Sequence, residues 1–210
     1  MILRTYVYVD AFNLYYGCLK GTRYRWLNLL ELSKRMLDAN NEILKIKYFT
    51  ARVGPVPDPT RPVRQQVYLR ALATIPLLEV HFGHFLAPRV MMPCVVPSGA
   101  KQTYVKVYKT EEKGSDVNIA TELLADAYAS KFDLAVLITG DSDLLAPVQH
   151  LHQHIRRRVG VLNPQSRPCV VLSKAATFYK QIREGVLKDS QFPDELTDKT
   201  GPFRRPEEWK

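Results

Sequence analysis

The sequence predicts an α/β fold in which helices and parallel strands alternate to build a doubly wound sheet. The first indication is the apolar run of residues 134–138, which is typical of a strand buried on both faces. The second is residues 6–9, another hydrophobic strand that ends in an acid. The third is that amphipathic helical segments separate the strands, and right-handed crossovers then place helices on both faces of the sheet.

Hydrophobic periodicity and turn residues predict the elements in chain order. Strands are expected at residues 4–10, 43–50, 77–86, 104–109, 134–139 and 159–162. Helices are expected at residues 11–19, 28–37, 63–75, 115–127, 144–154 and 173–182.

Three segments lack this periodicity. Residues 53–62 hold four prolines and are expected to form a loop. Residues 87–101 are rich in Pro, Gly and Ser, which predicts an irregular surface excursion, with a flap over the site as the alternative. Because charged residues, Pro and Gly dominate from Lys188 onward, we expect one domain over residues 1–187 and a mobile charged tail over residues 188–210.

Composition narrows the class of protein. The chain has 210 residues, 46% of them hydrophobic, which is enough for one domain with a full core. No apolar run approaches the roughly 20 residues of a membrane span, and the chain starts in a strand, so a cytoplasmic protein is expected. The three cysteines form no CxxC pair that would indicate a zinc or redox site. The net charge of +9 favours a polyanionic partner.

Acidic residues follow two of the predicted strands and begin one helix. Asp10 ends the first strand, Asp141 and Asp143 follow the central strand, and Asp116 lies at a helix start. In open parallel sheets the ligand crevice lies outside the carboxyl ends of the strands, so these acids are expected to meet there. Crowded carboxylates repel one another unless a cation lies among them. Mg²⁺ suits such a site because it prefers oxygen ligands, and two such ions can promote phosphodiester hydrolysis.

Each acid also has an ordinary structural interpretation. Asp10 and Asp116 could cap helices, and Asp141 and Asp143 could form a turn after Gly140. Taken singly, each of these interpretations is the simpler one. It is the joint pattern in a basic protein that favours a metal site.

Three short motifs, in this order, resemble those of NYN domains. Residues 10–13 resemble their D-x-x-N opening, residues 113–117 their K-G-x-D-V helix start, and residues 139–144 their S/T-G-D-S-D-F motif. The chain looks most like the bacterial LabA-like branch of the PIN-like nuclease superfamily, over about residues 4–165. Leu144 replaces the usual aromatic residue of the third motif.

The resemblance implies a three-layer α/β/α sandwich with a mostly parallel central sheet, and an endoribonuclease that cleaves RNA with Mg²⁺ or Mn²⁺. Asp10, Asp116 and Asp141 would be metal ligands, and Asp143 would be a further ligand or would orient water. Asn13 would hold Asp10 or a metal-bound water, with a purely local hydrogen bond as the alternative. The loop at residues 53–62 and the tail have no counterpart in the motifs.

RNA is the expected partner, no membrane contact is expected, and a homodimer is left open. Lys113 is a candidate contact to a substrate phosphate, and Arg156, Arg157 and Arg158 are candidates to grip the RNA backbone. The alternative in each case is a solvated charged side chain.

Other functions on similar sheets lack their motifs. A haloacid-dehalogenase-type phosphatase needs a second acid two residues after Asp10, where this chain has Phe12. No G-x-x-x-x-G-K-[ST] loop and no G-x-G-x-x-G after the first strand is present, so phosphate and dinucleotide cradles are missing. The remaining rival is an RNA-binding or scaffold protein of the same fold with little or no cleavage activity.

Overall fold

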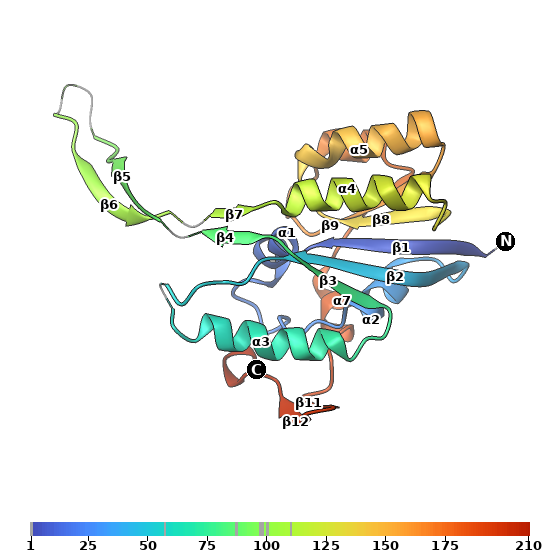
Figure 1. The fold of residues 1–210 in the computed structure, drawn as a ribbon, viewed down its shortest axis with the longest axis horizontal. Coiled ribbons are helices and arrows are strands. Elements are labelled where there is room, and N and C mark those ends of the chain that lie inside the picture. The colour runs from blue at the N-terminus through green and yellow to red at the C-terminus, as the bar shows by residue number, and fades with distance from the viewer. Residues whose placement is uncertain (1, 57, 87, 97–98, 100, 110) are drawn as a thin grey trace.

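The chain folds around a parallel sheet whose order is β10-β9-β8-β1-β2-β3 (Figure 1). The computed structural model describes all residues except 1, 57, 87, 97–98, 100 and 110. Within the described chain this sheet has six strands, and every neighbouring pair is parallel. The strands are β1 (Leu3–Asp10), β2 (Asn41–Thr50), β3 (Leu78–Phe82), β8 (Leu134–Ile138), β9 (Arg158–Asn163) and β10 (Phe178–Gln181).

The strand order places a topological switch point between β1 and β8. The chain runs outward from β1 through β2 to β3, and then returns to the other side of β1 for β8, β9 and β10. Val9 is in register with Ile138, so β1 and β8 end at the same level. The residues that follow these two strands therefore meet at one edge of the sheet, where such folds bind ligands.

Helices cover both faces, which confirms the predicted three-layer α/β/α class. In Figure 1 α4 and α5 lie on one face, and α2, α3 and α7 lie on the other. The helices are α1 (Ala11–Leu14), α2 (Leu29–Met36), α3 (Arg61–Ala73), α4 (Ser115–Tyr128), α5 (Leu145–His150), α6 (Val170–Ala175) and α7 (Glu184–Asp189). Short π- or 3-10-helical turns are η1 (Tyr15–Leu19), η2 (Ser142–Leu144), η3 (Leu151–Ile155) and η4 (Glu207–Trp209).

The unbroken apolar run of β8 follows from its position between two hydrophobic cores. Ala135 and Leu137 pack with the cluster on the α4 side, whereas Val136 and Ile138 pack with the cluster on the α2 and α3 side. Successive side chains of a strand point to opposite faces, so a central strand covered by helices on both sides needs apolar residues at every position. All five residues of β8 are buried.

A long β arm projects beyond the carboxyl edge of the sheet (Figure 1). At its base β4 (His84–Leu86) pairs with β7 (Glu111–Lys113), and farther out β5 (Arg89–Pro93) pairs with β6 (Tyr104–Tyr108), both antiparallel. The strand expected near residues 104–109 is therefore present as β6. The expectation of irregular structure for 87–101 is wrong at β5, because pairing with β6 supplies the hydrogen bonds that its own sequence does not suggest.

The segment after Lys188, for which a mobile charged tail is expected, contains regular elements and contacts to the core. Beyond α7 the chain forms β11 (Glu195–Asp198), β12 (Gly201–Arg204) and η4. Three aromatic side chains of this segment pack around the fully buried Trp26, with ring centroids 5.7, 6.4 and 6.2 Å from it: Phe192, Phe203 and Trp209. A charge-rich composition hid the few aromatic residues that hold the segment to the core.

Residues 173–182 were expected to be one helix, and the structure divides them. The helix α6 ends at Ala175, and Phe178–Gln181 form the edge strand β10. The Phe178 ring lies directly on Gly160 of β9 and leaves no room there for a Cβ atom. Residues 178–181 therefore form a strand because they pair with β9, and local periodicity does not predict this.

Candidate active site

Asp10 is the last residue of β1, and its side chain is almost completely buried, with 5% exposed. Its Oδ1 accepts a hydrogen bond of 2.9 Å from the backbone N–H of Asn13, which makes Asp10 the N-cap of α1. Its Oδ2 accepts a bond of 3.3 Å from the hydroxyl of Thr139, the residue after β8. Asp10 thus both caps a helix and faces the end of the neighbouring strand.

Burial above all, together with the negative charges of Asp116 and Asp141, raises the pKa of the Asp10 carboxyl to about 7. The hydrogen bonds from Asn13 and Thr139 act in the opposite direction, because they favour the charged carboxylate. Asp116, at the start of α4, and Asp141, in the turn after β8, are thus close enough to Asp10 to act on the pKa of its carboxyl.

Asp141 and Asp143 form the turn that follows β8. The Oδ1 of Asp141 accepts a hydrogen bond of 3.0 Å from the backbone N–H of Asp143, so Asp141 caps η2. The N–H of Asp141 donates to the hydroxyl of Thr139 at 3.1 Å. Thr139 therefore links Asp10 and Asp141 through one hydroxyl group. Asp143 is exposed beside them.

Asp116 lies in the first turn of α4 and is half-buried. The residue that caps this helix is Gly114, whose φ of 98° lies in the left-handed region that favours glycine. This turn carries the chain from β7 of the arm into α4 and sets Asp116 at the carboxyl edge. Asp116 is therefore not the N-cap residue of α4, although it is the acid of the first turn.

Asn13 positions the site through its side-chain amide. Its Oδ1 accepts hydrogen bonds from the N–H of Gly140 and from Nε2 of Gln165, each 2.9 Å long. An amide oxygen has two acceptor sites, so both are used. Asn13 joins the start of α1 to the turns after β8 and β9.

Asn163 holds the loop after β9 from inside. It is fully buried at the end of β9, and its Nδ2 donates to the carbonyls of Gln165 and Arg167 and to Oε1 of Gln181. This polar network and Thr139 were absent from the sequence-predicted site. A signal for Asn163 and Thr139 was present in the sequence, because each stands at or directly after the end of an apolar strand. All parallel strands of the sheet end at the same edge, so such polar residues gather there.

The basic residues predicted to bind RNA fall at two different places. Lys113 is exposed at the end of β7, next to the start of α4. Arg158 is in register with Leu134, the first residue of β8, whereas Asp141 follows the last one. At about 3.3 Å per strand residue, more than about 15 Å separates them.

Arg156, Arg157 and Arg158, the candidates to grip the RNA backbone, therefore lie away from the acids. Arg158 begins β9 at the amino edge of the sheet, and Arg157 just before it forms an ion pair with Asp133 at 3.8 Å. Arg167, in the loop after β9, is exposed at the carboxyl edge instead.

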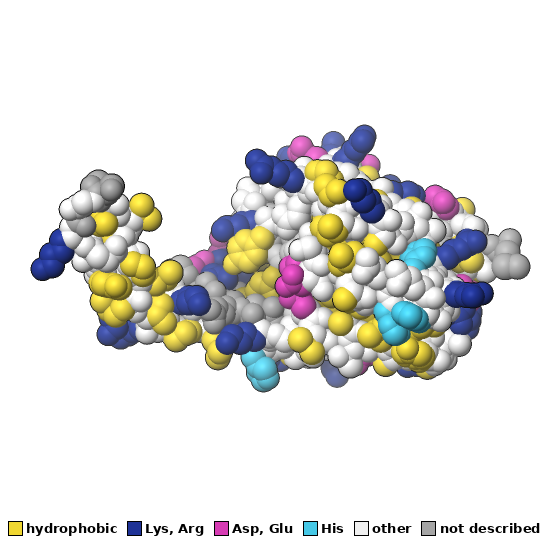
Figure 2. Space-filling model, turned by 90° about the horizontal axis from the view of Figure 1, so that it is seen from above, with side chains coloured by type: hydrophobic (Ala, Val, Ile, Leu, Met, Phe, Trp, Pro, Cys, Tyr) yellow, Lys and Arg dark blue, Asp and Glu magenta, His cyan; other side chains and the backbone are white. Residues whose placement is uncertain are grey.

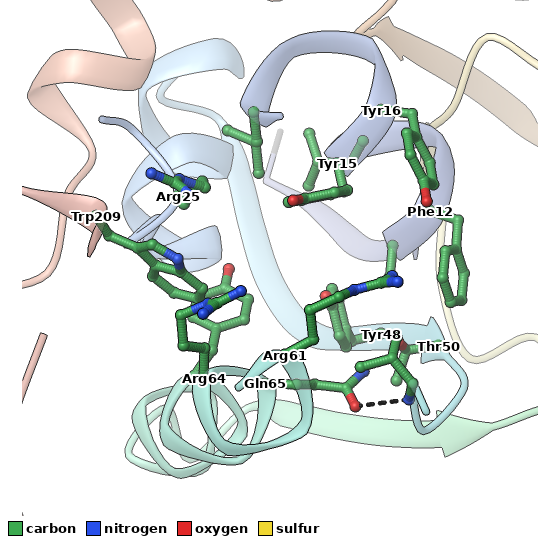
Figure 3. A pocket seen from close by; sticks show the side chains of 15 residues that line it. Phe12, Tyr15, Tyr16, Arg25, Tyr48, Thr50, Arg61, Arg64, Gln65 and Trp209 are labelled. Carbon is green, nitrogen blue, oxygen red and sulfur yellow. Dashed lines mark hydrogen bonds between the residues drawn. The ribbon is translucent and has the colours of Figure 1, made fainter. Parts of the chain in front are cut away.

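A pocket lined by aromatic rings and arginines lies beside the acids (Figure 3). Ala11 and Phe12, which follow Asp10 directly, form part of its wall. Burial raises the pKa of Tyr48 at its floor, and the charge of Asp10 raises it further, so the pocket and the acidic group share one edge of the sheet. Local sequence patterns do not reveal this pocket, because its walls come from five separate segments of the chain.

The family model of the NYN domain matches residues 4–184. The chain is an NYN domain protein. It is 31% identical to 6-hydroxy-3-succinoylpyridine 3-monooxygenase HspA of Pseudomonas putida, over 99% of its own length and 75% of that protein. A crystal structure of VPA0982, a protein of unknown function from Vibrio parahaemolyticus, covers 87% of this NYN protein and 94% of its own chain with a TM-score of 0.57 and 20% identity. The latter likeness concerns the fold alone.

Family membership gives this NYN protein a nuclease-like fold, and NYN nucleases typically use divalent metal ions. The buried Asp10, with its raised pKa and two acidic neighbours, suits a cation, because positive charge would stabilise its ionised form. Among the described residues, no group of three Asp, Glu, His or Cys side chains is arranged to hold one ion directly. The donors fit an ion such as Mg²⁺ that takes one or two carboxylates and keeps several waters. No helix in the described parts of the chain is long and apolar enough to cross a membrane.

Proposed function

We propose that this NYN protein is a metal-dependent endoribonuclease whose site is formed by Asp10, Asp116 and Asp141. The observation that carries the proposal is the environment of Asp10, a buried carboxyl with a pKa of about 7 because of burial and two nearby acids. Such a grouping destabilises the protein unless a cation neutralises it. A nuclease-like fold with this feature at its topological switch point supports hydrolysis of a phosphodiester.

In this proposal the residues divide into ligands and positioning groups. Asp10 and Asp141 would hold Mg²⁺ or Mn²⁺, while Asp116 and the exposed Asp143 would bind its waters or complete its ligand set. The bound ion would supply charge stabilisation and a more acidic water. Thr139 orients Asp10 and Asp141 through its hydroxyl group.

RNA is the proposed substrate because exposed Lys and Arg side chains lie near the carboxyl edge of the sheet, where the acids are. Lys113 and Arg167 are exposed there, and the arm carries the exposed residues Arg89, Lys106 and Lys109. Figure 2 shows hydrophobic and basic side chains close together on the arm. Tyrosine rings next to basic side chains suit the binding of single-stranded RNA. Its bases stack on the rings, and its phosphates attract the basic side chains.

The test is cleavage of labelled single-stranded RNA with Mg²⁺ or Mn²⁺, and with EDTA. We expect internal cuts that need metal and that disappear in Asp141→Asn. Arg158→Gln, at the opposite edge, serves as a control that should cut like wild type. Undiminished cleavage by Asp141→Asn would overturn the site. RNA binding without cleavage in every condition would favour the scaffold function instead.

Oxygenation of an aromatic acid is a second candidate, favoured by the relative named as a 6-hydroxy-3-succinoylpyridine 3-monooxygenase. A pocket with aromatic and arginine walls beside the acids suits a planar ring with a carboxylate. The reaction would insert one oxygen atom of O₂ and reduce the other to water with two electrons from NADH or another reductant. The measurement is O₂ consumption with that hydroxypyridine and NADH. Uncoupled or absent consumption removes the candidate.

A further inference from the structure

The pocket beside Asp10 is built from five parts of the chain. Its walls come from α1 and η1, from Arg25 in the segment before α2, from the carboxyl end of β2 and the loop after it, from the first half of α3, and from Trp209 near the C-terminus (Figure 3). Gln65 of α3 fixes the loop after β2, since its Nε2 donates to the carbonyl of Ala51 and its Oε1 accepts from the N–H of Val53. The wall is thus held by hydrogen bonds and not by packing alone.

The floor of the pocket consists of aromatic rings. Tyr48, Tyr68 and Trp209 are each at most 8% exposed. The Tyr68 ring makes edge contacts with both of the others, at centroid distances of 6.4 and 5.9 Å. Tyr15 and Tyr16 stand at the rim, in edge contact with each other at 5.2 Å. A flat ring that enters the pocket would contact the small exposed parts of the floor rings and the more open ring of Tyr16, which is 51% exposed at the rim.

The polar part of the pocket is positively charged. Arg25, Arg61 and Arg64 line it, and no acid is among the described residues that do. Burial lowers the pKa of Arg25, and the positive charges of Arg64 and Arg205 lower it further, although Tyr15 and Glu208 oppose them. Positive charge is therefore concentrated around a partly buried space, and an anion there would relieve it.

The three arginines differ in how far they are already paired. Arg64 forms ion pairs with Asp58 and Glu208, and Arg25 donates to the carbonyls of Thr22 and Glu208. The guanidinium of Arg61 has no ion pair with any residue that the structure describes, and its one hydrogen bond to a described residue, the carbonyl of Val56, is long at 3.4 Å. In Figure 3 its side chain extends from α3 into the space between Tyr15 and Tyr48. Arg61 is the guanidinium available to a ligand.

We propose that this pocket binds one unpaired nucleotide, with the base on the aromatic floor and the phosphate on Arg61. A guanidinium binds phosphate through two parallel hydrogen bonds, and a base stacks on aromatic rings whatever its identity. An apolar ligand would leave the arginines without an anion, and an inorganic anion would leave the floor uncovered. The aromatic acid of the second candidate function would meet both needs and would therefore compete with a nucleotide for this pocket. The nucleotide can come from an RNA strand or from solution. The RNA source rests on the nuclease function proposed above, whereas the free nucleotide does not.

The position of the pocket adds a functional consequence. The wall residues Ala11 and Phe12 follow Asp10 directly in sequence. A nucleotide held there would place a neighbouring phosphate of the same strand at the acidic group. Occupancy of the pocket would then determine which phosphodiester is cut.

Nucleotide binding is measured by quenching of tryptophan fluorescence, because Trp209 lines the pocket, and by calorimetry. The probes are 5′-UMP and 5′-AMP, with uridine and ribose 5-phosphate as partial ligands. We expect both nucleotides to bind, and each partial ligand to bind more weakly than either. Arg61→Gln should weaken nucleotide binding about tenfold, as expected for the loss of a charge-assisted contact. Arg158→Gln removes the same charge at the far edge and should leave binding unchanged.

Equal binding by Arg61→Gln and wild type would overturn the pocket assignment, as would ribose 5-phosphate binding as tightly as the nucleotides. Melting curves of both variants establish that they are folded. A second experiment uses RNA in which the nucleotide expected to occupy the pocket lacks its base. Wild type should then no longer cut at its preferred site.

The two proposals fail separately. If wild type cuts RNA while Arg61→Gln changes neither nucleotide affinity nor cut site, the pocket inference is wrong and the nuclease function stands. If nucleotides bind through Arg61 and no RNA is cut, the nuclease function is wrong, and the pocket is a site for free nucleotides. Asp141→Asn should bind nucleotides like wild type and cut nothing.

Discussion

The side-chain oxygen of Asn13 accepts a hydrogen bond from the backbone N–H of Gly140, 2.9 Å away. This bond joins the turn after β1 to the turn after β8, across the switch point of the sheet. The same oxygen accepts from Gln165, so three loops meet at one atom. The geometry of the acidic group depends on this junction.

Asn13→Ala should destabilise the protein by about 1–3 kcal/mol, because the N–H of Gly140 loses its partner in a half-buried place. The free energy of unfolding in urea measures this. We also expect a loss of RNA cleavage at temperatures where the variant is fully folded, since Gly140 directly precedes Asp141. Full activity of the folded variant would show that Asn13 is not needed to position the acids.

Gly140→Ala should be more damaging than its small size suggests. A Cβ atom there would lie 2.5 Å from Oδ1 of Asn163 and 2.7 Å from Cγ of Gln165. Overpacking of this kind typically costs about 1–3 kcal/mol. Gly185→Ala is the matched control, because the Cβ that alanine would add there has nothing within 4 Å, and helix propensity favours alanine. Thermal melts of the two variants should shift in opposite directions.

Asp10 should make stability fall as the pH rises, in the absence of divalent metal. Its pKa is about 7 in the folded protein, above the ordinary value of 3.8. Between these values the folded state retains a proton that the unfolded state has lost, so the stabilisation present below pH 4 disappears by about pH 7. Asp10→Asn should remove this dependence. Urea titrations of both proteins from pH 4 to 8 measure it, and a parallel pH dependence in the variant would contradict the assignment.

The same proton should compete with metal. Because a carboxyl must ionise to bind a cation, the affinity for Mn²⁺ should increase by up to about tenfold per pH unit below pH 7 and level off above it. Calorimetric titration at several pH values tests this. In wild type, Mn²⁺ should also restore stability at pH 8, by mass action on the folded state.

A buried ionic cluster holds α4 against the sheet. Asp126 of α4 is 1% exposed, accepts a hydrogen bond of 2.8 Å from the hydroxyl of Tyr8, and pairs with Lys47 of β2 and with Lys131. Asp126→Ala would leave Lys47 buried without its main counter-charge, although Glu122 remains nearby, and should cost about 3–5 kcal/mol.

A surface pair provides the control for that prediction. Asp133 pairs with Arg4 at 2.9 Å, with both side chains partly exposed. Asp133→Ala should cost about 1 kcal/mol or less, because solvent screens such pairs. Similar losses of unfolding free energy in the two variants would show that burial of the Asp126 cluster has little energetic weight.

Local sequence determined the layered fold and the edge that holds the acids. An unbroken apolar run such as β8 is only stable between two cores, and parallel strands that end in Asp10 and in Thr139–Asp141 must present these residues at the same edge. No knowledge of strand order was needed for this conclusion. It depends only on the direction of the strands.

Tertiary structure alone decided which side chains complete the site. Arg156, Arg157 and Arg158 stand together in the sequence as candidate RNA contacts, and only the strand register shows that they lie at the edge opposite the acids. Trp209 lay in a charge-rich segment, yet it closes the pocket that opens beside Asp10. Such contacts join residues more than a hundred positions apart, and hydrophobic periodicity carries information only about neighbours along the chain.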